Sequence, residues 1–248
     1  MTELVIDKRF CGPRAFANGG YAAGRFASVI GGPAEVMLKA PVPFDTAIIL
    51  VADEREPSRF RAMAGDVEIA TIRPGTVSVT PPSPPDNNAA VAARQAFIDD
   101  GDMTLYYPYC FVCGKRRAEG DGMRIFAGPV PDVDFNADQW TPSDDLAGED
   151  GLVRPEFVWA ALDCPTAFAL RMDNAPVLLG RFTVEVRRRP APGEPLIVAA
   201  WRDGQEGRKH FSSSAIYDEK RDIIAVANAV WIELNDSAML ARLRAENA

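Results

Sequence analysis

The chain repeats itself, and this internal repeat limits the folds open to it more than any other feature. A Pro-x-Pro turn at 41–43 recurs at 190–192, an offset of 149 residues. Each turn leads into an apolar run with β-branched residues, at 48–51 and at 196–198. Similar elements in the same order indicate tandem duplication of one structural unit. The sequence therefore predicts two similar halves.

Each half is predicted to contain one buried helix followed by four antiparallel strands. The helices are expected at about 19–30 and 154–170, where a helix-start pattern leads into an apolar segment. Strands are expected at about 35–40, 46–53, 58–64 and 67–73, and then at 177–188, 195–202, 208–217 and 223–234. A helix wrapped by a curved antiparallel sheet is an α+β unit. Two such units would pack as an intrachain pseudo-dimer with a pseudo-twofold axis.

A Pro-rich stretch between the halves is expected to act as a stiff linker. A short helix should follow at about 89–98, capped by Asp86 or by an adjacent Asn. The predicted organisation is an N-terminal unit at 1–82, a linker with the short helix at 83–100, and a C-terminal unit at 101–248.

Composition narrows the function classes. A net charge of −8 over 248 residues argues against electrostatic binding of nucleic acid or of an anionic membrane. The sequence lacks an apolar run of about 20 residues and the layout of a signal peptide. Four cysteines in a chain of this length do not suggest a disulfide scaffold. The expected location is the cytoplasm.

Two helix starts differ in their chemistry. Asn18, Gly19 and Gly20 begin the first predicted helix, where free N–H groups point outward and glycine permits close approach. Asp163 lies inside the second predicted helix, and burying such a carboxylate without partners is costly. A resemblance of the chain to a known family implies that the start of the first helix faces the middle of the second, so Asn18, Gly19 and Gly20 are predicted to meet Asp163. The structural alternatives are an ordinary Asn-Gly-Gly turn and an Asp that forms a cap near Pro165.

The corresponding mirror arrangement lacks these groups. The second helix starts with Arg154, Pro155 and Glu156 in place of Asn-Gly-Gly. The position in the first helix that corresponds to Asp163 is Ala27, which has no reactive group. One composite site is therefore predicted, and its mirror is predicted to be inactive.

This layout resembles the hotdog fold, and specifically the double-hotdog acyl-CoA thioesterases. Asn18-Gly19-Gly20 resembles the His-Gly-Gly and Gly-Gly-Gln openings of hotdog thioesterases. Residues 160–163 resemble the helix segment whose Asp is catalytic in phenylacetyl-CoA-type and acyl-CoA-thioesterase-II-type enzymes. Cys110-Phe-Val-Cys-Gly, leading to 120–126, resembles a strand of single-domain hotdog thioesterases. The resemblance implies hydrolysis of an acyl-CoA or acyl-carrier thioester without a cofactor, with Asp163 as base or nucleophile.

The sequence also departs from that family. Asn18 replaces the His, and the positions around 179–180 and 229–230 are apolar or Gly where acyl-CoA thioesterase II has a Ser or Thr and a Gln. A non-catalytic double hotdog that binds acyl groups is therefore the alternative. A hotdog dehydratase would need a catalytic His, and the single histidine, His210, lies in a predicted strand. A homodimer of double hotdogs is a further possible assembly.

Further side chains are assigned to substrate binding. The apolar slot for the acyl chain is predicted to be lined by Tyr21, Phe26, Phe157 and Trp159. Arg187 and Arg189 are predicted to hold coenzyme A phosphates, with a solvated strand face as the alternative.

The cysteines are predicted not to bind metal. Cys110-x-x-Cys113 has the spacing of a zinc pair, but a structural site needs four ligands. The other candidates, Cys11, Cys164 and His210, look scattered along the chain. Cys164 is expected to be a packed thiol.

Overall fold

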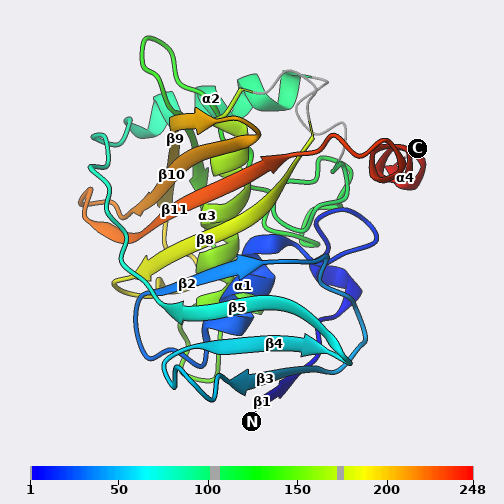
Figure 1. Ribbon diagram of the computed structural model, residues 1–248. Helices are drawn as coiled ribbons and strands as arrows, with labels where there is room; N and C mark the ends of the chain where they lie inside the picture. Colours follow the sequence, from blue (N-terminus) through cyan, green and yellow to red (C-terminus); the bar gives the residue numbers. More distant parts are fainter. Residues whose placement is uncertain (1, 101–106, 172–175, 248) are drawn as a thin grey trace.

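A single antiparallel sheet of eleven strands forms the centre of the computed structural model, which describes residues 2–100, 107–171 and 176–247 (Figure 1). The first half contributes helix α1 (Gly19–Ala27) and strands β2 (Ala34–Leu38), β3 (Ile48–Ala52), β4 (Phe60–Ala64) and β5 (Val67–Pro74). The second half contributes helix α3 (Pro155–Phe168) and strands β8 (Val177–Val186), β9 (Leu196–Glu206), β10 (Lys209–Tyr217) and β11 (Ile223–Glu233).

The remaining elements extend the edges and ends of this sheet. Strand β1 (Thr2–Leu4) pairs with β3 at one edge, and β7 (Asn136–Trp140) and β6 (Gly128–Pro129) follow β9 at the other. Helix α2 (Asn87–Asp99) contacts β7, and helix α4 (Ser237–Asn247) follows β11. Short 3₁₀ turns lie at Lys8–Phe10 and Asp144–Leu146.

The two halves have the same strand order. In the sheet β2 is followed by β5, β4 and β3, and β8 is followed by β11, β10 and β9. Strands β2 and β8 pair antiparallel at the junction, with Val36 opposite Phe182. Two copies related by a twofold axis would pair in this way. The predicted α+β arrangement of two helices against one antiparallel sheet is confirmed.

Local signals set most element boundaries. Asp86 caps α2 by accepting the N–H of Ala89, as predicted. Helix α1 ends at Ala27, three residues before the predicted end, ahead of Gly31-Gly32-Pro33. The predicted division into 1–82, 83–100 and 101–248 remains a prediction, and residue 101 lies outside the described residues. No helix in the described part of the chain is both long and apolar enough to cross a membrane.

Helices α1 and α3 lie on the same face of the sheet and pack directly against each other (Figure 1). A Cβ atom placed on Gly24 would lie 2.7 Å from Glu156 Cα and 2.9 Å from Trp159 Cβ. The absence of a side chain at Gly24 therefore lets the two helix backbones approach. Tyr21 stacks on Phe10 at a ring separation of 4.2 Å beside this crossing. The contact between the halves is a buried core.

We expect Gly24→Ala to destabilise the protein by about 1–3 kcal/mol, because the added methyl group overpacks the helix crossing. In an isolated helix the same change would be favourable by about 1 kcal/mol. Gly31→Ala is the control, since a Cβ atom there meets nothing within 4 Å. Urea unfolding of the two variants measures the difference. A Gly24→Ala protein as stable as the wild type would contradict the tight crossing.

Candidate functional site

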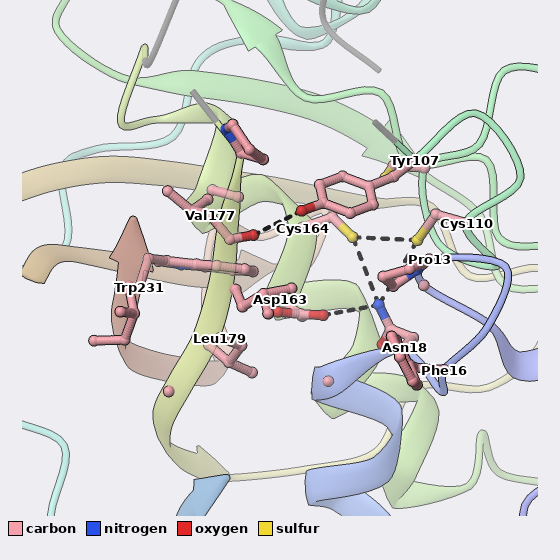
Figure 2. Close-up of a pocket in the computed structure, with 18 of the residues that line it drawn as sticks. Pro13, Phe16, Asn18, Tyr107, Cys110, Asp163, Cys164, Val177, Leu179 and Trp231 are labelled. Atoms are coloured by element: carbon pink, nitrogen blue, oxygen red, sulfur yellow. Dashed lines mark hydrogen bonds between the residues drawn. The ribbon is translucent and has the colours of Figure 1, made fainter. Parts of the chain in front are cut away.

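Asp163 of α3 lies at the interface of the two halves and is 1% exposed. Its Oδ2 atom accepts a hydrogen bond of 2.8 Å from Asn18 Nδ2 and one of 3.0 Å from the Gly20 backbone N–H. Figure 2 shows the amide group of Asn18 pointing at the carboxyl group of Asp163. The structure thus brings the start of α1 and Asp163 together.

Asn18 holds its orientation through a second bond. Its Oδ1 atom accepts the backbone N–H of Tyr21 at 2.8 Å, which makes Asn18 the N-cap of α1. Because the amide oxygen is used in the cap, the amide nitrogen must face Asp163. One side chain therefore both starts the helix and supplies a donor to the buried carboxyl group.

The two glycines have different roles in the geometry. A Cβ atom on Gly20 would lie 2.3 Å from Asp163 Cβ, so any side chain there would displace Asp163. A Cβ atom on Gly19 would lie 3.0 Å from Leu179 Cδ2 on β8. As the first residue of α1, Gly19 has a backbone N–H with no acceptor inside the helix. This N–H group is available to a ligand at the positive end of the helix dipole.

Burial dominates the electrostatics of Asp163. It raises the pKa of the carboxyl group to about 7, against the Gly20 N–H and the Asn18 amide, which lower the pKa by stabilising the charged form; Cys110 adds to the rise. Within the described residues, Asp163 Oδ1 has no hydrogen-bond partner. Oδ2 is therefore fixed by two donors, and Oδ1 is buried without a partner in this part of the chain.

A cavity of about 1030 Å³ opens beside Asp163. Its walls are mostly apolar and come from both halves, including Phe16, Leu38, Val42, Leu179 and Trp231. In Figure 2, the side chains of Leu179 and Trp231 lie on the strand side of the cavity, opposite Asn18. The combination of an apolar cavity and a few converging polar groups is typical of a small-molecule site.

The aromatic residues assigned to the acyl slot from the sequence lie elsewhere. Tyr21, Phe26, Phe157 and Trp159 are at most 4% exposed and pack in the core around the helix crossing, away from the cavity lining. Helical periodicity marks such positions as buried but does not tell a core from a cavity wall. The actual lining residues come from segments far apart in the sequence, so no local pattern identifies them.

The arginines assigned to phosphate binding also lie away from the cavity. Arg187 pairs with Glu185 at 3.0 Å, and Arg189 pairs with Asp150. The cations of the cavity lining are Lys39 and Arg171 instead. Neither stands in a basic run, so the sequence offered no signal for them.

The mirror arrangement at the start of α3 differs as predicted in its residues. Arg154 makes no capping side-chain bond, and Pro155 occupies the first turn. Glu156 lies 3.8 Å from Arg154 in an ion pair. Ala27, opposite in the pseudo-symmetry, has no polar side chain. The described residues contain the Asn-Gly-Gly and Asp arrangement once.

A second set of hydrogen bonds, which the sequence did not predict, holds the part of α3 around Asp163. The Thr166 hydroxyl donates to the Asp163 backbone oxygen at 2.6 Å, and the Trp231 indole N–H donates to Thr166 at 2.9 Å. The sequence signal is weak, since it consists only of a threonine one turn after Asp163. These hydrogen bonds tie α3 to β11 directly behind the site.

The cysteines correct one expectation. Cys164 lies apart from the Cys110-x-x-Cys113 pair along the sequence, but the three sulfur atoms all lie within 4.8 Å of one another. The loop that contains the pair folds over the middle of α3. Hydrogen bonds from Cys113, Cys164 and the loop backbone lower the pKa of the Cys110 thiol. Cys11 is separate, with its sulfur 3.1 Å from Arg117.

Comparison with known proteins identifies the architecture. No known protein family matches the sequence, and no curated protein is significantly similar to it. The structure is similar to that of a putative thioesterase II from Thermobifida fusca YX, with a TM-score of 0.60, 14% identity, and coverage of 94% of this chain and 92% of the other. A tesB protein of Mycobacterium avium subs paratuberculosis gives a TM-score of 0.59, 12% identity, and coverage of 94% and 93%. At such identities the likeness shows the fold: this chain has the double-hotdog architecture of thioesterase II-like structures.

We expect Asn18→Ala to destabilise the protein more than Asn18→Ser. Serine can still cap α1 but cannot reach Asp163. Asn18→Ser therefore loses one hydrogen bond to a charged group, which lowers the free energy of unfolding by about 1.5–3 kcal/mol. Alanine also removes the cap, which costs about 1 kcal/mol more. Urea unfolding at one pH measures both variants. Equal losses would show that the cap and the Asp163 bond are not separate contributions.

Proposed function

We propose that the protein hydrolyses acyl thioesters at one composite site formed by Asp163 of α3 and the start of α1. The observation that carries this proposal is the buried Asp163, which lines an apolar cavity and is fixed by Asn18 and Gly20 through one oxygen, while its other oxygen has no partner among the described residues. The cavity has room for an acyl chain, and the site offers a carboxylate and a helix N-terminus to the thioester group.

The reaction follows from the two sides of the site. The thioester carbonyl oxygen would accept the Gly19 N–H at the start of α1, where the helix dipole stabilises developing negative charge. Asp163 Oδ1 would take a proton from a water molecule as that water attacks the carbonyl carbon. The tetrahedral intermediate then expels the thiolate, which takes up a proton. The products are a carboxylic acid and a free thiol. Direct attack by Asp163 would form an anhydride that water hydrolyses to the same products.

The substrate class follows from the cavity. An acyl group would occupy the apolar walls around Leu179 and Trp231, and the thiol carrier would extend toward Lys39 and Arg171. Lys39 and Arg171 are paired with Glu68 and Asp134 in the structure, and the phosphates of coenzyme A would compete with these carboxylates. An acyl carrier protein presents the same phosphopantetheine chemistry. The double-hotdog structures similar to this chain carry thioesterase names, which supports a thioester substrate.

The alternative is a double hotdog that binds acyl groups without turnover. Two donors at the start of α1, the Asn18 amide and the Gly20 N–H, already donate hydrogen bonds to Asp163. The cavity wall beside Gly19 is formed by Leu179 and Gly180, which supply no hydroxyl or amide side chain. This observation favours the alternative, because a bound water would then be oriented by Asp163 alone.

We expect Asp163→Asn to lower kcat for acyl-CoA hydrolysis by about 10²–10⁴-fold, because the amide cannot accept a proton. Binding should be retained, since asparagine has nearly the same shape and its oxygen can accept the same two bonds. The measurement is thiol release from short, medium and aromatic acyl-CoAs, together with calorimetric binding of the product acids or of coenzyme A.

The matched control for Asp163→Asn is Glu156→Gln, which neutralises the carboxylate at the start of α3, in the mirror arrangement. It should leave turnover close to that of the wild type. Equal losses in the two variants would overturn the one-sided site. Tight binding of acyl-CoA by the wild type with no turnover of any ester tested would establish the binding module instead.

We expect Lys39→Ala combined with Arg171→Ala to raise KM for acyl-CoA by about 2- to 5-fold with little change in kcat, as for the loss of exposed ion pairs. Added salt should weaken binding to the wild type in the same direction. Arg187→Ala is the control and should leave KM unchanged. A rise in KM only for Arg187→Ala would place the phosphates on the strand face and not at the cavity.

A further inference from the structure

Three thiols meet at the inner wall of the cavity. Cys110 and Cys113 come from the loop that follows Tyr107, and Cys164 comes from α3, next to Asp163. The sulfur atoms of Cys110 and Cys164 are 3.6 Å apart (Figure 2). All three sulfurs lie within 4.8 Å of one another. Tetrahedral zinc with bonds of about 2.3 Å separates its sulfur ligands by about 3.8 Å. The cluster needs only small side-chain rotations to reach that geometry.

The loop around Cys110 is a tight turn that holds Cys110 and Cys113 close together. The Gly114 N–H donates to the Cys110 carbonyl at 2.8 Å. A Cβ atom on Gly114 would lie 2.6 Å from Cys110 N, so the tight turn requires glycine. Two cysteines separated by two residues have the spacing of a zinc pair, and each cysteine binds the metal as a thiolate.

A side-chain donor completes the surroundings of the sulfurs. Asn18 Nδ2 lies 3.7 Å from both Cys110 Sγ and Cys164 Sγ, in addition to its bond to Asp163. The three cysteines are 1–8% exposed. Thiolates in such a buried place are costly unless a cation neutralises them. Three buried sulfurs within 4.8 Å of one another, with an amide donor beside two of them, point to a bound cation.

We propose that Cys110, Cys113 and Cys164 form a three-thiolate site for a soft divalent cation, zinc in the first place, whose fourth coordination position faces the cavity. All three residues line that cavity, so the fourth ligand is a water molecule or a ligand atom that enters there. Each thiol that becomes a ligand releases its proton to solvent. Asn18 positions the sulfurs from outside the coordination sphere. The site is independent of the proposed hydrolysis, although it shares the cavity with Asp163.

Metal content and cobalt spectroscopy of the untagged, full-length protein test this site. We expect about one zinc ion per chain in protein purified without chelator. After removal of zinc, Co²⁺ should produce the intense thiolate-to-cobalt absorption in the near ultraviolet and the visible bands of a tetrahedral ion. Addition of 2-mercaptoethanol should shift the visible bands, and an unchanged spectrum would overturn the open fourth position.

Single substitutions locate the ligands. Cys110→Ala, Cys113→Ala and Cys164→Ala should each lose the stoichiometric zinc and the cobalt bands, whereas Cys11→Ala, whose thiol lies outside the cluster, should keep both. Circular dichroism checks that each variant is folded, and the wild-type titration decides the question even if a variant is not.

Two results would overturn the inference. One is wild-type protein that is free of zinc and gives no thiolate-to-cobalt band on titration. The other concerns the metal-free protein. Its mass would show a disulfide between two of the cluster cysteines, and the protein would still bind no metal after this disulfide is reduced. Since these readouts do not depend on turnover, a protein that binds zinc but hydrolyses no thioester would retain this site and lose the proposed function.

Discussion

The burial of Asp163 between the two halves is the constraint on which the rest of the site depends. A carboxyl group in a protein interior is stable only if hydrogen-bond donors replace water. Both donors to its Oδ2 come from the start of α1, in the other half of the chain. Their reach requires that Gly20 have no side chain and that α1 and α3 cross closely at Gly24. The site therefore forms only when the two halves pack against each other.

The two halves share one frame but differ in their chemistry. The β2–β8 pairing joins two sets of strands with the same order into one sheet, and the two helices pack against each other. A pair of identical halves would have two equivalent sites. Here Asn18 and Gly20 lie on one side, while Arg154 and Glu156 occupy the matching positions on the other.

The segment between the halves adds chemistry that the repeat lacks. It includes α2, the strands β6 and β7, and the loop that brings Cys110 and Cys113 over α3. That loop contacts the site through Asn18, whose amide faces both a carboxyl group and two sulfurs. One asparagine therefore links the α1 cap, the buried acid and the cysteine cluster, and a change at Asn18 should affect all three.

The sequence by itself determined the duplicated α+β frame, because periodicity and turn residues are local properties that survive in any context. The resemblance of its motifs to hotdog thioesterases also predicted the meeting of Asn18, Gly19 and Gly20 with Asp163, because in hotdog dimers the start of one helix faces the middle of the other. The tertiary structure decided which apolar residues line the cavity and which only fill the core. It also brought Cys164 beside Cys110. These contacts join segments with no fixed spacing along the chain, so only the packing of the folded protein sets them.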